Sequence, residues 1–131
     1  MGAFDMLRIA NSSLGFHQTW LDALANNIAN INTAKRTDQS AFRATMVIAG
    51  SRSDGGVDVA GIALSDPVGR VVNDPQNALA DGEGNVRLPD VDLASQMSQL
   101  VMAQRGFQAS VQVTKNAQDT YSSALQIGRS S

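Results

Sequence analysis

Apolar residues recur every seven positions at both ends of the chain, and this spacing constrains the fold more than any other sequence feature. The first such segment runs from Phe4 to Ile31. Its two rows, three residues apart, comprise Leu7, Leu14, Leu21 and Ile28, and Ala10, His17, Leu24 and Ile31. Positions seven apart lie on one face of a helix, and rows of this kind form coiled-coil seams. The pattern predicts a long helix with an apolar seam.

The other end of the chain has the same period. One row comprises Leu93, Leu100, Phe107, Thr114 and Tyr121, and the adjoining row includes Met97, Val111 and Leu125. Asp90 and Asp92 precede this segment and suit the start of a helix, by capping and by their charge at the positive end of the helix dipole. Gly128 is the expected stop. Gly106 is unfavourable inside a helix, and one explanation is the close approach of a neighbouring segment.

Residues 34–89 have a different composition. They hold all three prolines and seven of the eleven glycines. Short apolar runs between Gly, Asp and Pro predict strands at Ala44–Ile48, Val57–Ile62 and Gly69–Val72.

These segments predict a mainly α fold, with long antiparallel N- and C-terminal helices forming a coiled-coil-like hairpin around a small β-rich insertion. Helices of about 30–37 residues would be roughly 45–55 Å long, further than the middle segment is expected to cover. Each seam must therefore be covered by the other helix or by other copies. The expected domains are residues 1–33 with 90–131, which polymerise, and the insertion 34–89.

The composition leaves little for catalysis. Ten basic and twelve acidic residues give no strong net field, so nucleic acid is not an expected partner. The chain has no cysteine and one histidine, which excludes thiolate sites. Nowhere do 18 apolar residues run together, so no membrane span is expected. The sequence predicts no catalytic, metal-binding or cofactor-binding residue.

Two local patterns could suggest chemistry. The run from Asp81 to Asp92 resembles the acidic spacing of a calcium loop, but Val86 stands at the sixth position, where that loop needs glycine. A tight turn is the favoured interpretation. His17 lies on a seam row without a sequence-adjacent acid, which favours a half-buried packing histidine over a general base.

Amides and hydroxyls replace charges on the two helical segments. Residues 1–33 contain only Asp5, Arg8 and Asp22 as charged residues. In the last 42 residues, 17 are Asn, Gln, Ser or Thr. Amides can hydrogen-bond across an interface at lower cost than buried charges. This surface is either an ordinary uncharged exterior or one suited to contacts on several sides, and the helix lengths favour self-assembly.

The first helical segment ends in a recognisable motif. Residues 21–33 read LDALANNIANINT, which resembles the N-terminal signature of bacterial flagellar rod and hook proteins. The matching motif residues are Ala25, Asn26, Asn27, Ile28, Ala29, Asn30 and Thr33. The runs at 74–92, 104–110 and 124–128 are similar to a proximal-rod member of that family.

The resemblance implies a structural subunit of the flagellar basal-body rod, the hollow shaft that transmits torque from motor to hook in flagellum-dependent motility. It implies a basal-body location and passage through the flagellar type III export apparatus without a cleaved signal peptide. The implied partners are copies of this chain, other rod subunits, the export apparatus and the basal-body base. The insertion would lie on the outer side of the rod.

The seam rows supply the residues of the expected assembly interface. They are Leu7, Leu14, Leu21, Leu24, Ile28, Ile31, Leu93, Met97, Leu100, Phe107, Val111, Tyr121 and Leu125.

Two other classes of protein remain open. A helical-hairpin adaptor or export chaperone would bind one partner helix and never polymerise, and it would stay in the cytoplasm. An enzyme would need a polar cluster that the sequence does not offer. Within the rod family, a neighbouring proximal-rod paralogue is the nearest competitor.

Phe107→Ala tests the predicted seam. If the ring is fully buried in the assembled helices, its loss costs about 3–5 kcal/mol. We expect a soft-agar assay to show loss of motility, while secretion of the subunit continues. Normal swimming by this variant would contradict the assignment of Phe107 to the seam.

Overall fold

The computed structural model describes residues 2–131; Met1 of the expected first domain lies outside them. Along the chain, a long helix comes first and another comes last, and two separate antiparallel pairs of strands lie between them. The elements are α1 (Ala3–Ala29), β1 (Thr45–Ser51), β2 (Val57–Leu64), β3 (Arg70–Asn73), β4 (Asn85–Leu88) and α2 (Leu93–Ser130).

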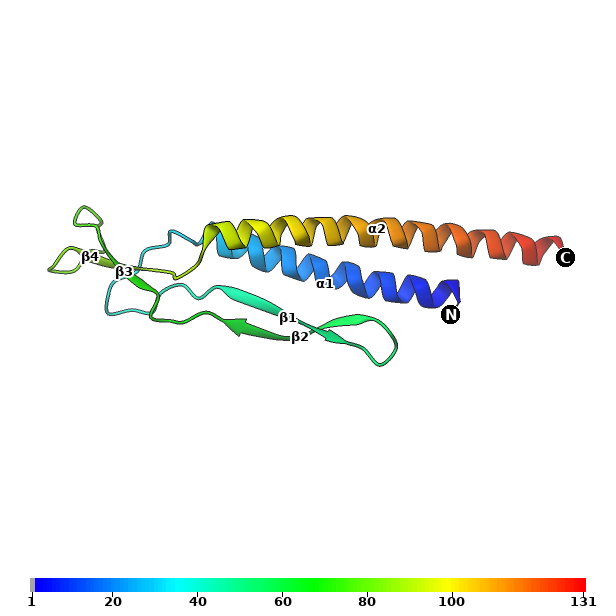
Figure 1. The fold of residues 1–131 in the computed structure, drawn as a ribbon, viewed down its shortest axis with the longest axis horizontal. Coiled ribbons are helices and arrows are strands. Elements are labelled where there is room, and N and C mark those ends of the chain that lie inside the picture. The colour runs from blue at the N-terminus through cyan, green and yellow to red at the C-terminus, as the bar shows by residue number, and fades with distance from the viewer. Residues whose placement is uncertain (1) are drawn as a thin grey trace.

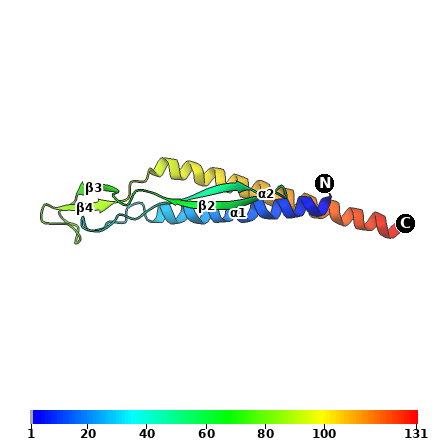
Figure 2. The same cartoon turned by 90° about the horizontal axis from the view of Figure 1, so that it is seen from below.

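The molecule is elongated, with its helices side by side and antiparallel (Figure 1). The β1–β2 hairpin runs along α1, and the β3–β4 pair lies at the end opposite the C-terminus (Figure 1). A view turned by 90° again shows the end of α2 extending past the N-terminal end of α1 (Figure 2). At a rise of about 1.5 Å per residue, α1 is roughly 40 Å long and α2 roughly 57 Å long.

The prediction of a mainly α fold is wrong. Helices of 27 and 38 residues account for about half of the 131 residues. The strand region is also more than a small insertion between the helices, because the β1–β2 hairpin covers one side of α1 (Figure 1). A strand advances about 3.3 Å per residue, twice the rise of a helix. A short hairpin therefore reaches along most of α1, which the length argument from sequence did not allow for.

Local chemistry accounts for the helix ends. The Asp92 carboxylate accepts the N–H groups of Ala94 and Ser95, as expected for a helix start. Asn30 caps α1 with φ −106°, outside the left-handed region, and its side chain donates to the Asn26 carbonyl at 2.9 Å. Gly128 does not stop α2, which continues to Ser130.

Small side chains form the closest contact between the helices. On α2 the buried residues are Ala103, Ser110 and Ala117, spaced seven apart, which we call the small-residue row. The Ser13 and Ser110 hydroxyl oxygens are 2.7 Å apart across this seam. The predicted row that begins at Leu93 is instead displaced from the point of closest approach. Small side chains at these positions let the two helix backbones approach closely.

Three points hold the β1–β2 hairpin against α1. The Arg8 guanidinium contacts Asp54 at the hairpin tip, and the Ser12 hydroxyl accepts the Val57 N–H at 3.1 Å. At the other end, the Asn27 side chain binds the backbone of Thr45. The register shifts between Ile48 and Ala49, so the hairpin contains a bulge or irregularity there.

The β3–β4 pair is closed by the turn that sequence analysis favoured over a calcium loop. Asp81 Oδ1 accepts the N–H groups of Glu83 and Asn85, each at 2.9 Å. Gly84 has φ +81°, which glycine adopts readily. Strand β4 was not predicted, because Val86 and Leu88 alternate with polar residues over only four positions.

The pKa of Asp81 lies below its ordinary value of 3.8 because the Asn85 N–H and then the Thr37 hydroxyl donate to its carboxylate. A depressed carboxyl pKa means that the stabilisation is fully present above pH 3.8 and is lost as pH falls through the lower, folded-state pKa. We expect the Glu83 and Asn85 amide resonances to titrate together in NMR spectra, with a midpoint below 3.8.

Asp81→Asn should abolish this shared titration and serves as its control. A midpoint at or above 3.8 in the unmodified chain would show that these hydrogen bonds do not form in solution.

Candidate assembly interface

The structure divides the residues of the predicted assembly interface into covered and uncovered groups. Leu24 is buried at 2% exposure. The half-buried group comprises Leu7, Leu14, Leu21, Ile28, Ile31, Leu100 and Phe107. The exposed group, between 41% and 52%, comprises Leu93, Met97, Val111, Tyr121 and Leu125. The first helix therefore directs its predicted residues largely inward, whereas most of those on α2 remain available to another molecule.

The sequence analysis did not predict that the small-residue row forms the inner face of α2. The usable signal was the spacing of Ala103, Ser110 and Ala117, which have the same period as the larger residues. Small residues allow two helix backbones to approach closely, so they take the inner position while the larger apolar residues lie beside it. All five exposed residues of the predicted interface on α2 come from the rows that were predicted to face α1.

The C-terminal end of α2 extends past the N-terminal end of α1 (Figure 1). Beyond Ala117 every residue is exposed, and we call residues 118–130 the overhang. Offsets of four and seven positions keep residues on one helix face, so Tyr121, Ala124 and Gly128 continue the side that faces α1 at Ala117. Leu125 borders this side, and Asp119 lies opposite it. The overhang thus continues the inner face of the helix pair beyond the end of α1.

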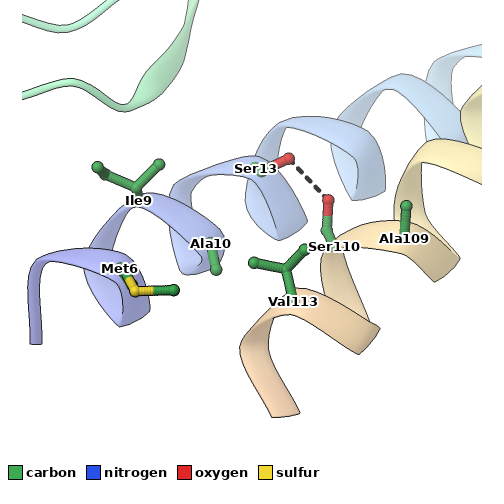
Figure 3. A pocket seen from close by; sticks show the side chains of 7 residues that line it. All are labelled: Met6, Ile9, Ala10, Ser13, Ala109, Ser110 and Val113. Atoms are coloured by element: carbon green, nitrogen blue, oxygen red, sulfur yellow. Dashed lines mark hydrogen bonds between the residues drawn. The ribbon is translucent and has the colours of Figure 1, made fainter. Parts of the chain in front are cut away.

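An apolar groove of about 300 Å³ lies between the helices near the start of α1. Met6, Ile9 and Ala10 of α1 and Ala109 and Val113 of α2 line the groove, and the Ser13–Ser110 hydrogen bond lies beside them (Figure 3). None of the lining residues is charged. The groove can hold an apolar side chain, and it offers nothing that would activate a substrate.

Asn27 joins three elements within the family-like motif. It is 1% exposed, and its amide donates to the Thr45 carbonyl at 2.9 Å and to Gln96 Oε1 at 3.0 Å. Its Oδ1 accepts the Thr45 N–H at 2.9 Å. Both donors and one acceptor position of the side-chain amide are used, so Asn27 links α1 to both β1 and α2.

The other motif residues have different roles. Asn30 donates to Asn26, and the Thr33 hydroxyl donates to Asn30 Oδ1 at 3.1 Å. These contacts close the end of α1. Ile28 is half-buried, whereas Ala25 and Ala29 are exposed. The motif therefore combines a buried clamp, a helix cap and an uncovered small-residue surface.

Charge is concentrated where the hairpin tip meets α1. Hydrogen bonding to Arg8 lowers the pKa of Asp5 and raises the pKa of Arg8. Partial desolvation raises the pKa of Asp54, but the Gly56 N–H and the guanidinium groups of Arg52 and Arg8 outweigh it, so the pKa lies below its ordinary value. These exposed ion pairs position the tip and contribute modestly to stability.

His17 is held as a packing residue. Its Nδ1 lies 2.8 Å from the Ser13 carbonyl oxygen and 3.3 Å from the Ser13 hydroxyl. The shorter contact assigns the Nδ1 proton to the carbonyl, which leaves this nitrogen unable to act as a base toward Ser13. The opposite ring edge lies against Gly106, so the close approach suggested by that glycine is confirmed.

Within residues 2–131, no cluster of three or more His, Cys, Asp or Glu side chains is arranged to hold a metal ion. Neither described helix combines the length and apolar character that crossing a membrane requires.

Comparison with known proteins places this architecture in a family. A family described as "Flagellar basal body rod FlgEFG protein C-terminal" matches residues 83–127, which include β4 and most of α2. The flagellar basal-body rod protein FlgC of Yersinia enterocolitica is 33% identical over 135 residues, covering 98% of this chain and 100% of the relative. The chain belongs to the FlgC family of flagellar basal-body rod proteins.

Two further FlgC proteins show the breadth of the match. FlgC of Escherichia coli O157:H7 is 31% identical over 134 residues, and FlgC of Bacillus subtilis is 28% identical over 150 residues. Each alignment covers 98% of this chain and 100% of the relative. The resemblance seen in the sequence is thereby confirmed, and the relatives are rod proteins, a structural class.

Asn27→Ala tests the clamp that Asn27 forms by hydrogen-bonding to Thr45 and Gln96, which joins α1, β1 and α2. The change leaves the Thr45 backbone groups and Gln96 without their partner, which should destabilise the fold by about 2–4 kcal/mol. Thermal unfolding followed by circular dichroism measures the loss. Asn26→Ala, at the adjacent exposed position, is the matched control and should change the midpoint far less. Equal effects of the two variants would show that the clamp does not hold the fold together.

Proposed function

We propose that this chain is a structural subunit of the proximal part of the flagellar basal-body rod, assembling through its helices and catalysing no reaction. The observation that carries the proposal is the uncovered surface of α2. Leu93, Met97 and Val111 are almost half exposed, although they belong to a regular helical pattern. A single chain leaves that pattern unfilled, and neighbouring helices would cover it.

The proposed partners are copies of this chain and other rod subunits. The overhang supports contacts along the rod, because it extends the inner face of α2 past the end of α1. Amides and hydroxyls around the apolar residues can hydrogen-bond with neighbours without burying unpaired charge. Joined end to end and side by side, such subunits would form a hollow shaft that transmits torque from motor to hook.

The terminal helices and the insertion would have separate roles. The hairpin occupies one side of α1, so neighbouring helices have access to the remaining sides of the helix pair. This arrangement supports a polymerisation domain made of residues 1–33 and 90–131, with residues 34–89 on the outer side of the rod. We further propose type III export without a cleaved signal peptide, followed by docking near the basal-body base.

A charge on the overhang tests assembly. Leu125→Asp places a carboxylate beside the line of Ala117 and Tyr121, where a neighbouring helix would bury it at high cost. We expect export to continue, incorporation into purified basal bodies to fall sharply, and motility on soft agar to be lost.

Gln126→Asp introduces the same charge at the adjacent position, about a quarter of a turn from Leu125 and, like Asp119, on the side of the helix opposite this face. This control should still enter basal bodies. If Leu125→Asp assembles as well as Gln126→Asp, the overhang is not an assembly surface. A chain that never co-purifies with basal bodies would instead indicate a cytoplasmic adaptor.

A further inference from the structure

The inner face of α2 would by itself permit more than one alignment with α1. Ala103, Ser110, Ala117 and Ala124 are small residues at a constant spacing of seven. A helix that packs on such a row can slide by one heptad, about 10.5 Å, and meet an equivalent surface. Some other feature must therefore select the observed register.

His17 and Gly106 form a contact that the repeat does not duplicate. A Cβ atom at Gly106 would lie 2.2 Å from His17 Nε2 and 2.5 Å from Cδ2, far inside contact distance. The ring cannot easily swing away, because Nδ1 is held by the Ser13 carbonyl at 2.8 Å. Phe16 and Trp20 also border it, with ring centroids 5.5 and 6.2 Å away.

The positions one heptad away from Gly106 cannot replace it. They are Gln99 and Val113, and both carry side chains beyond Cβ. A shift of α1 by seven residues in either direction would drive the imidazole into one of them. The histidine therefore fits at one position along the seam.

A second contact selects the same register. The buried Asn27 amide donates to Gln96 Oε1 at 3.0 Å. The positions seven residues before and after Gln96 are Pro89, which precedes α2, and Ala103 within α2, and neither has a side-chain acceptor. The steric contact and the hydrogen bond thus agree, although they lie at different places along α1.

We propose that His17, seated on Gly106 and supported by the Asn27–Gln96 hydrogen bond, determines the axial register of the two helices and hence the length of the overhang. A one-heptad slip would change the overhang by seven residues. The effect of such a slip on rod assembly rests on the proposed function, whereas the register itself does not. The short connection between β4 and α2 offers a competing cause, because it also links the helices.

Disulfide trapping in the isolated chain distinguishes these causes. The chain has no cysteine, so introduced pairs report register without background. Ser13→Cys with Ser110→Cys reports the observed register, since the native hydroxyl oxygens are 2.7 Å apart. Ser13→Cys with Ala117→Cys reports a one-heptad slip. Intramolecular bridges are measured at high dilution on non-reducing gels.

The decisive variant moves the glycine against which the His17 ring packs. Gly106→Ala with Val113→Gly removes the glycine at the native position and introduces one seven residues away. We expect the dominant bridge to change from 13–110 to 13–117. Val113→Gly alone is the control. It should give a smaller amount of the 13–117 bridge, because Gly106 still accommodates the His17 ring at the native position. Exclusive 13–110 bridging in every variant would overturn the proposal, because the register would then be kept without the His17–Gly106 contact.

A double-mutant cycle covers the case in which the variant with the moved glycine does not fold. Gly106→Ala should lower the thermal midpoint when His17 is present, and adding His17→Ala should restore much of the loss because the obstructing ring is gone. Additive losses would overturn the steric contact on which the proposal depends. Neither measurement requires an assembled rod, so failure of the proposed function would leave their outcome unchanged.

Discussion

Close packing of two helices over small side chains is the constraint on which the remaining structure depends. Ala103, Ser110 and Ala117 bring α2 near enough to α1 for two serine hydroxyls to lie 2.7 Å apart. Because the inner positions are small, the larger apolar residues are displaced to the flanks of the pair or to its outer surface. The same packing that stabilises the single chain thus leaves apolar surface on α2 for other molecules.

The strand region strengthens one side of this pair and leaves the others open. Asn27 connects α1 to β1 and α2 through three hydrogen bonds of its side-chain amide, and charged contacts occur mainly at the hairpin tip, around Asp54. Charges are thereby kept where solvent remains, while the long helix surfaces are largely uncharged. For a rod subunit, this distribution lowers the cost of covering the helices with neighbours.

Local sequence signals predicted the local features well. The Asp92 cap and the turn around Asp81 follow from side-chain groups that bind backbone a few residues away. The anomalous Gly106 correctly indicated a close neighbour, and the motif around Asn27 indicated the rod family. Gly128 was misleading, because glycine permits a helix stop without requiring one. Strand β4 was too short to give a pattern.

The sequence alone determined the presence of two long helices and their period, since these depend on contacts between near neighbours. It also determined the family, because the motif residues can be read directly from the sequence. Only the tertiary structure decided which row faces inward. Leucine and alanine rows on α2 share one period, so the choice depends on how closely α1 approaches. The reach of the hairpin, which overturned the mainly α description, was likewise decided by Thr45 meeting Asn27, 18 positions away in sequence.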